Sequence, residues 1–194
     1  MMKLMRLYLP LCVCAALLAA GDSIPAQPRA FVIDAAQTHV EFSVGSTLHT
    51  VHGTFRLKHG DLRFDPATGK AAGELVVDAA SGDSGSNARD RRMNSAILEV
   101  VRFPEVAFRP DRVDGKVADE GRSEVELHGM LAIHGAEHEM MVPLLVEAHD
   151  GVYNATASFA VPYIKWGMKN PSTLMLRVND KVEITVHTRA HPGT

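Results

Sequence analysis

The stretch THVEFSVGSTLHTVHGTFRLK, residues 38–58, decides the fold class of this 194-residue chain. Its first half alternates apolar and polar side chains over residues 39–45, and its second half does so again over residues 50–58. Because successive side chains of a β-strand point to opposite faces, this alternation predicts two strands, each with one dry and one wet face. The dry face must contact either core side chains or a molecule from outside.

The same alternation recurs to the end of the chain. The further alternating segments are residues 62–64, 73–79, 103–110, 124–133, 140–148, 154–161 and 181–188. Turn signals separate most of them, such as Pro66 and Gly69 in one turn and the hairpin-type Asp150-Gly151 in another. Eight or more such strands predict an all-β domain, with an antiparallel sheet closed into a barrel or folded into a sandwich.

One segment, residues 85–101, departs from this pattern. Its apolar residues recur at steps of three and four, as on one face of a helix, and Ser86 or Asn87 stands where a helix cap belongs. We expect one helix of about ten residues, lying across a barrel end.

The N-terminus predicts a secretory signal peptide over residues 1–21, and cleavage as late as residue 26 remains open. Lys3 and Arg6 form a basic start, and the apolar run over residues 7–20 is too short to span a bilayer comfortably. We therefore expect export to the periplasm or out of the cell.

The remaining chain divides into a flexible lead-in over residues 22–30 and one domain over residues 31–194. Cys12 and Cys14 are the two cysteines, and both fall inside the expected signal. The exported domain would therefore contain no disulfide and no thiolate nucleophile, and its core alone must stabilise it.

Charge and hydropathy exclude two classes of partner. The chain carries 20 basic and 23 acidic residues, and the expected signal removes two of the basic ones. No basic cluster stands out, so we expect no nucleic-acid partner. Beyond residue 20 no apolar run approaches the length of a membrane span, so the mature chain should be soluble. The sequence leaves a homodimer open.

Five motifs in one order carry a resemblance to a known family. They are FVIDAAQTHVEFSV (31–44), NARDRRM (87–93), RFPEVAF (102–108), HGMLAIHG (128–135) and VPLLVE (142–147). Together they resemble the YceI-like family of bacterial periplasmic polyisoprenoid-binding proteins, over residues 31 to about 188. The resemblance implies a lipocalin-like antiparallel β-barrel of about eight strands with one short helix near a barrel end. It implies no catalysis and no cofactor.

The resemblance also implies a long apolar interior that holds a polyisoprenoid, an isoprenoid quinone or a similar amphiphilic lipid for storage or transport. A very short loop before His49 and the segment NSAILEVV at residues 94–101 depart from the family pattern and leave the identity of the ligand open. The residues expected to form the apolar tunnel wall are Val40, Phe42, Val44, Phe55, Leu75, Val77, Phe108, Leu127, Leu131, Leu144, Val146 and Phe159.

From the residues alone, a filled interior and a hollow one are equally open. The inward registers contain small residues, which either leave an apolar void for a guest or merely permit strand coiling and close packing. These small residues are Gly53, Gly73, Ala79, Gly129, Ala155 and Ala157. The resemblance favours a ligand tunnel.

Three residues are candidates for contact with a ligand head group. Arg89 and Asp90 stand near the expected helix start, and Trp166 is the only tryptophan, with lysines on both sides. Each has a structural alternative: Arg89 and Asp90 can seat the helix, and Trp166 can pack within an ordinary loop.

The histidines suggest a metal site, but no complete one. His134 and His138 flank a turn, and His49 and His52 lie three residues apart. A zinc site needs three or four convergent ligands, so each pair is incomplete, and we expect no metal.

No motif for catalysis stands out. The chain lacks a nucleophile elbow, a phosphate-binding glycine loop and a dinucleotide fingerprint, so we expect no enzyme. Two alternatives remain open. A lipid-modifying hydrolase or isomerase would need at least two titratable side chains that converge inside the tunnel, whereas a packed-core interaction module would have no cavity.

Overall fold

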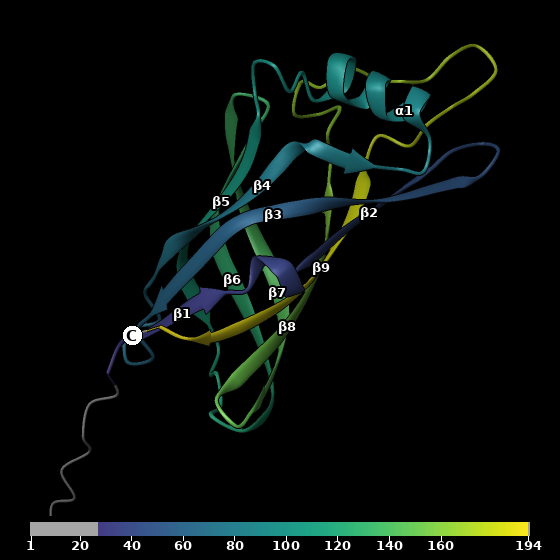
Figure 1. Cartoon of the computed structure of the whole chain (residues 1–194). Helices are drawn as coiled ribbons and strands as arrows, with labels where there is room; N and C mark the ends of the chain where they lie inside the picture. The colour runs from purple at the N-terminus through teal and green to yellow at the C-terminus, as the bar shows by residue number, and fades with distance from the viewer. Residues whose placement is uncertain (1–26, 194) are drawn as a thin grey trace, which may run out of the picture.

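Eight strands close into an antiparallel barrel in the computed structural model, which describes residues 27–193 (Figure 1). The described residues form nine strands, of which β2 to β9 close the barrel and β1 is an additional short strand. They are β1 (Arg29–Ile33), β2 (His39–Gly45), β3 (Thr50–Phe64), β4 (Ala71–Asp83), β5 (Glu105–Asp114), β6 (Gly121–Ile133), β7 (Ala136–His149), β8 (Val152–Val161) and β9 (Val182–Pro192). Strands β2 to β9 pair with their neighbours in sequence, and β2 pairs with β9 to complete the circle. This confirms the predicted all-β barrel. The predicted signal peptide lies outside the described residues.

The ninth strand, β1, continues the line of β2. β1 pairs with the ends of β3 and β9 near Phe64 and Pro192, and β2 pairs with the same two strands farther along. The short 3-10 helix η1 (Ala35–Gln37) joins them. Asp34 Oδ1 accepts hydrogen bonds from Ala36 N at 2.9 Å and Gln37 N at 3.2 Å, and Thr38 Oγ1 donates to the Asp34 carbonyl at 2.7 Å. Asp34 and Thr38 of the first motif therefore stabilise the 3-10 turn that interrupts the line of β1 and β2.

The predicted helix is present and has two parts. The α-helix α1 (Asn87–Arg92) continues into one π-helical turn, η2 (Met93–Ile97). Ser86 occupies the N-cap position as predicted, but its side chain makes no capping hydrogen bond. Among the described residues, no helix combines the length and the apolar character that crossing a bilayer requires.

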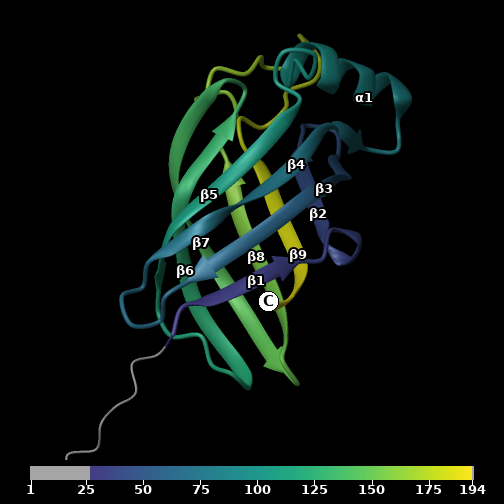
Figure 2. The same cartoon turned by 60° about the vertical axis from the view of Figure 1, so that its left-hand side comes forward.

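The barrel has two unlike ends (Figure 2). At the end that we call the helix end lie α1, the β2–β3 hairpin and the long connection over residues 162–181. The opposite end is filled by a cluster of buried apolar side chains, in which the rings of Phe31 and Tyr153 pack edge to face with centroids 4.9 Å apart. This cluster closes the opposite end of the barrel, and some of its members, such as Leu127 and Ala157, also line the cavity described below.

Candidate ligand-binding cavity

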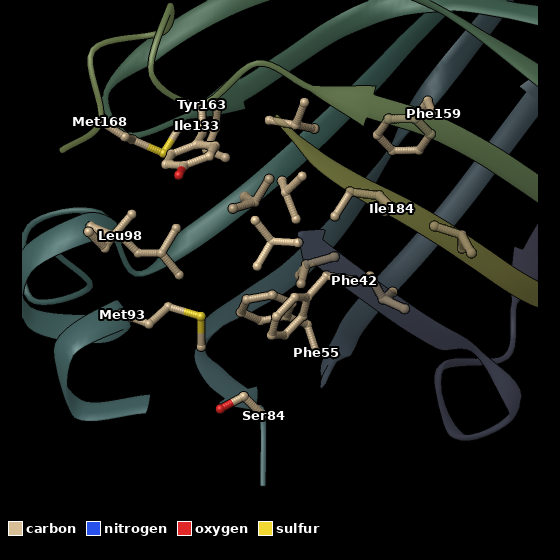
Figure 3. Close-up of a pocket in the computed structure, with 18 of the residues that line it drawn as sticks. Phe42, Phe55, Ser84, Met93, Leu98, Ile133, Phe159, Tyr163, Met168 and Ile184 are labelled. Atoms are coloured by element: carbon tan, nitrogen blue, oxygen red, sulfur yellow. The ribbon is translucent and has the colours of Figure 1, made fainter. Parts of the chain in front are cut away.

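A cavity of about 660 Å³ fills the half of the barrel near the helix end. Inward side chains of β2 to β9 form its wall, and side chains of the helical segment and of residues 162–181 form its roof (Figure 3). Nearly all of these side chains are aliphatic or aromatic. The volume lies within the range of about 300–1,000 Å³ that is usual for ligand pockets. The barrel thus encloses an apolar hollow rather than a solid core.

Eleven of the twelve predicted wall residues line this cavity. They are Val40, Phe42, Val44, Phe55, Leu75, Val77, Phe108, Leu127, Leu131, Leu144 and Phe159. Val146 does not line the cavity: it is 8% exposed and belongs to the packed cluster at the opposite end. Its alternation with Val142 and Leu144 predicted the inward face, but alternation carries no information about depth along the barrel axis.

The roof of the cavity is formed by residues that the strand alternation did not predict. Met93 and Leu98 of the helical segment line it from one side, and Tyr163 and Met168 line it from the other (Figure 3). Ile97 of the same helical segment also lines the cavity. The helical periodicity of Met93 and Ile97 was the one available signal for these residues, since it marks the apolar face of a helix that must cover something.

Tyr163 is held in place by a partly buried hydrogen bond. Its hydroxyl donates to the Asn179 carbonyl at 2.7 Å, which ties the beginning of the 162–181 connection to its end. Burial, with Asp180 nearby, raises the pKa of Tyr163 above its ordinary value. The hydroxyl therefore remains neutral and acts as a brace.

Some of the small inward residues enlarge the cavity, whereas others permit close packing of neighbouring groups. Ala155 and Ala157 line the cavity and widen it. At Gly53 and Gly129, by contrast, an added Cβ would collide with the rings of Phe42 and Phe108. These two glycines therefore permit close packing of aromatic rings on the cavity wall and leave no empty volume of their own.

The other two small residues also do not enlarge the cavity. Gly73 has φ of +133°, and a Cβ there would collide with the backbone of Asp61 on β3. Ala79 is 2% exposed and lies outside the cavity lining. Both serve local packing of β4.

Polar groups gather where the cavity reaches the surface at the helix end. This mouth is formed by Ser46, His49, Ser84, Arg89, Arg92 and Leu176. Arg89 donates from Nε to Ser84 Oγ at 2.8 Å and from its terminal nitrogen to the Ser84 carbonyl at 2.7 Å. Arg92 donates to the Pro171 carbonyl at 3.3 Å. The mouth thus presents two guanidinium groups beside an apolar interior.

Asp90 and Trp166, the other two head-group candidates, lie outside the cavity lining. Asp90 accepts hydrogen bonds from the backbone N–H and the hydroxyl of Ser84, so it anchors the helix to the end of β4. Trp166 stacks on His138 with ring centroids 4.0 Å apart and an angle of 7° between the planes. Asp90 therefore helps to seat the helix, and Trp166 packs against a neighbouring side chain.

The histidine pairs do not converge. The ring of His134 packs on Phe103 with centroids 4.8 Å apart, His138 stacks on Trp166, and His49 lies at the cavity mouth. None of these contacts brings three ligands together.

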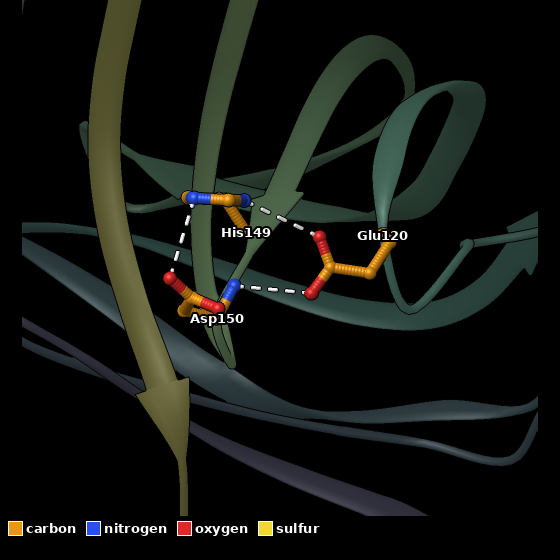
Figure 4. Close-up of side chains that lie close together, drawn as sticks. All are labelled: Glu120, His149 and Asp150. Carbon is orange, nitrogen blue, oxygen red and sulfur yellow. Dashed lines mark hydrogen bonds and ion pairs between the residues drawn. The ribbon is translucent and has the colours of Figure 1, made fainter.

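A different group of ionisable side chains comes together at the opposite end of the barrel. Glu120, His149 and Asp150 are exposed and lie close together, His149 at the end of β7 and the other two in the adjoining connections (Figure 4). His149 Nδ1 lies 3.4 Å from Glu120, and Asp150 N donates to Glu120 at 3.1 Å. These contacts brace the β7–β8 turn, so they have a structural explanation.

The cavity offers little for acid–base chemistry. Of the described residues that line it, the titratable ones are His49, Arg89, Arg92 and Tyr163, and no carboxylate is among them. Arg89 and Arg92 donate hydrogen bonds to Ser84 and to the Pro171 carbonyl, and Tyr163 is engaged in its structural hydrogen bond. The converging pair that a lipid-modifying enzyme would need is not assembled among these lining residues.

Comparisons with known proteins agree with this architecture. BcnA from Burkholderia cenocepacia matches with a TM-score of 0.67 and 17% identity, covering 81% of this chain and 98% of that one. A polyisoprenoid-binding domain from Saccharophagus degradans matches with a TM-score of 0.65 and 16% identity, covering 85% and 99%. A YceI protein from Campylobacter jejuni matches with a TM-score of 0.55 and 14% identity, covering 70% and 81%. Among curated proteins none matches.

At these identities the structural matches establish the shared fold, a barrel of the YceI and lipocalin-like type. The family model for the YceI-like domain matches residues 31–190, which is most of the chain and all of the barrel except the outer ends of β1 and β9. The resemblance carried by the five sequence motifs is confirmed. The chain belongs to the YceI-like domain family.

Proposed function

We propose that this protein is an exported, soluble binding protein that holds one long apolar molecule in its barrel for storage or transport. The observation that carries the proposal is the apolar cavity of about 660 Å³ in a barrel whose other half is tightly packed. The ligand class is a polyisoprenoid, an isoprenoid quinone or a similar amphiphilic lipid. The polyisoprenoid-binding domain among the structural matches supports this class.

The cavity volume limits the length of chain that can be enclosed. A dry apolar cavity of roughly 150 Å³ accepts one benzene molecule. Scaled from that case, the present cavity of about 660 Å³ holds on the order of 25 carbon atoms, or about five isoprene units. A longer chain would have to fold back or extend through the mouth.

Burial alone supplies enough free energy for binding. Each CH₂ group that moves from water to an apolar wall gains about 0.8 kcal/mol, so one isoprene unit contributes several kcal/mol before the cost of ordering the chain. No wall residue needs to form a hydrogen bond with such a chain. A polar head group would stay at the mouth, where Arg89 and Arg92 offer donors.

The location follows from the expected signal peptide and is part of the proposal. Export to the periplasm suits a carrier that shields a water-insoluble chain between membranes. We propose binding rather than catalysis because the cavity lining described above contains no carboxylate.

A direct titration tests the proposal. Protein stripped of lipid with organic solvent and refolded is titrated with a polyprenol, and binding is followed through displacement of an apolar fluorescent probe. The wild type should bind with saturation, and Leu131→Asp should lose binding, because it places a charge at a cavity-wall position that is 6% exposed. Met141→Asp, on the exposed face of the adjacent β7, is the matched control and should bind normally. Equal binding by both variants would refute the cavity as the site.

A further inference from the structure

Large apolar side chains are exposed at the helix end of the barrel. Among the described residues, six large hydrophobic side chains are strongly exposed, and four of them lie on connections at this end. These four are Leu48, Val101, Leu174 and Met175. A single exposed apolar side chain is ordinary, but a group beside the mouth of an apolar cavity indicates an interaction surface.

Three of these four side chains belong to two connections that are bonded to each other. The β2–β3 hairpin, which carries Leu48, is tied to residues 162–181: Thr47 N donates to the Arg177 carbonyl at 2.9 Å. A tight turn in the same connection, closed by the Thr173 N–H to the Leu176 carbonyl at 2.8 Å, presents Leu174 and Met175 at its tip. The backbone thus holds these apolar groups out on a fixed support.

The exposed tip is continuous with the cavity. Leu174 and Met175 are fully exposed, at 106% and 93%, while the next residue, Leu176, lines the mouth. Arg92 donates to the Pro171 carbonyl and so joins this connection to α1. An apolar path therefore runs from the cavity wall over Leu176 to the outside of the protein.

Two exposed arginines lie on the segments that border this path, Arg91 on α1 and Arg177 in the 162–181 connection. Arg91 and Arg177 are exposed, and among the described residues neither has a carboxylate within 4.0 Å. Arg109 and Arg112 on the barrel wall, by contrast, each pair with carboxylates. The chain as a whole has a net charge of −3, and the opposite end exposes Glu120 and Asp150 (Figure 4). The charge distribution favours an anionic surface as the partner of the helix end.

We propose that the rim formed by Leu48, Leu174, Met175, Arg91 and Arg177 docks the mouth of the barrel on a bilayer that contains anionic phospholipid. Apolar side chains that enter the boundary between head groups and acyl chains, together with nearby cations, are the two contributions that hold proteins at such a surface. A protein partner would be expected to offer a defined pocket for each apolar anchor, whereas an adjacent pair of fully exposed side chains on a turn suits a fluid interface. In the docked state a lipid could pass between bilayer and cavity without crossing water.

This inference goes beyond the proposed function, and vesicle binding tests it without any ligand in the cavity. The protein is sedimented with vesicles of phosphatidylcholine alone and of phosphatidylcholine mixed with phosphatidylglycerol. Every variant keeps the same N-terminus, so differences report on the rim. The wild type should bind the anionic vesicles and bind the neutral ones far more weakly.

Two pairs of substitutions separate the contributions. Leu174→Ser with Met175→Ser should weaken binding to anionic vesicles by at least about tenfold, because two apolar anchors are lost. Arg91→Gln with Arg177→Gln should weaken it by about fivefold for each charge, with little effect on neutral vesicles. Met141→Ser and Arg122→Gln, away from the rim, are the controls and should bind as the wild type does.

The proposal is overturned if the wild type sediments with neither kind of vesicle, which would leave a protein partner as the reason for the exposed tip. It is also overturned if the Leu174→Ser, Met175→Ser variant binds as well as the wild type. Polyprenol binding in solution should be unchanged in these variants, so a failure of membrane docking is distinguishable from a failure of the lipid-binding function.

Discussion

The ring of Phe42 lies directly over Gly53 on the paired strand β3, so closely that a side chain at position 53 would collide with it. The same added Cβ would also collide with the backbone carbonyl of Asp83. Phe42 in turn contacts Phe55, with ring centroids 5.3 Å apart. An absent side chain on one strand thus positions an aromatic pair that forms one side of the cavity.

Gly53→Ala should therefore destabilise the protein. The backbone contact cannot move aside easily, so we expect a loss of about 1–3 kcal/mol in the free energy of unfolding, as for other overpacked sites. Urea unfolding followed by circular dichroism measures it. Thr54→Ala, at the exposed neighbouring position, is the control and should change stability by less than about 0.5 kcal/mol. Equal stability of the two variants would contradict the packing that we describe.

The break between β1 and β2 gives a second prediction. Asp34→Ala removes the acceptor for the N–H groups of Ala36 and Gln37, as the loss of a helix cap does, and should cost about 1 kcal/mol of stability. Asp34→Asn keeps an acceptor oxygen and should recover most of that loss. If Asp34→Asn were as destabilised as Asp34→Ala, the side-chain cap would not be what holds the break.

His128 gives a pH-dependent prediction. Its Nδ1 lies 2.6 Å from Asp111 and its Nε2 lies 2.8 Å from Glu139. Both hydrogen bonds raise the pKa of His128, and the one with Asp111 contributes the most. A raised pKa in the folded state means that the protonated ring stabilises the fold. That stabilisation is fully present below the ordinary histidine pKa of about 6.5 and is lost as the pH rises through the raised value.

His128→Gln should therefore be destabilised relative to the wild type in mildly acidic buffer, and the difference should shrink as the pH rises. Urea midpoints of both proteins over a series of pH values measure this. Because the carboxylates are exposed, added salt should reduce the effect. His52→Gln on the outer face of β3 is the control. A difference that grows with pH would contradict the assignment.

Filling the cavity should reduce its capacity while leaving the fold intact. Ala157 lies on the cavity wall between Leu144 and Val186, so Ala157→Phe projects a ring into the hollow. We expect at least about tenfold weaker polyprenol binding, because several buried carbon atoms of the ligand would be displaced. Ser158→Phe adds the same ring to the exposed face of the same strand and should bind normally. Weaker binding by both variants would point to a general disturbance of β8.

The sequence predicted the faces of the strands better than their positions along the barrel. Period-two alternation identified Val40 and Leu131 as inward, because a strand has only two faces. It could not distinguish the cavity wall from the packed end, and so it placed Val146 in the wall. That distinction depends on which strands approach each other at each level, and β1 contributes by closing the opposite end with Phe31.

The roof and the mouth were harder to predict. The helical period indicated that Met93 faces something apolar, but the 162–181 connection has no period, so nothing in its sequence pointed Tyr163 inward and Trp166 away. Glycines were ambiguous for a similar reason. A glycine in a strand marks either unfilled space or a place where a neighbour approaches closely, and only coordinates show the ring of Phe42 over Gly53.

Mass spectrometry of an organic extract from the freshly purified wild-type protein tests whether the barrel carries a ligand. We expect one co-purified apolar lipid in amounts close to the molar amount of protein, and a loss of that lipid in the Ala157→Phe variant but not in Ser158→Phe. An extract without lipid, together with no polyprenol binding by the stripped protein, would contradict the claim that this barrel is built around a ligand.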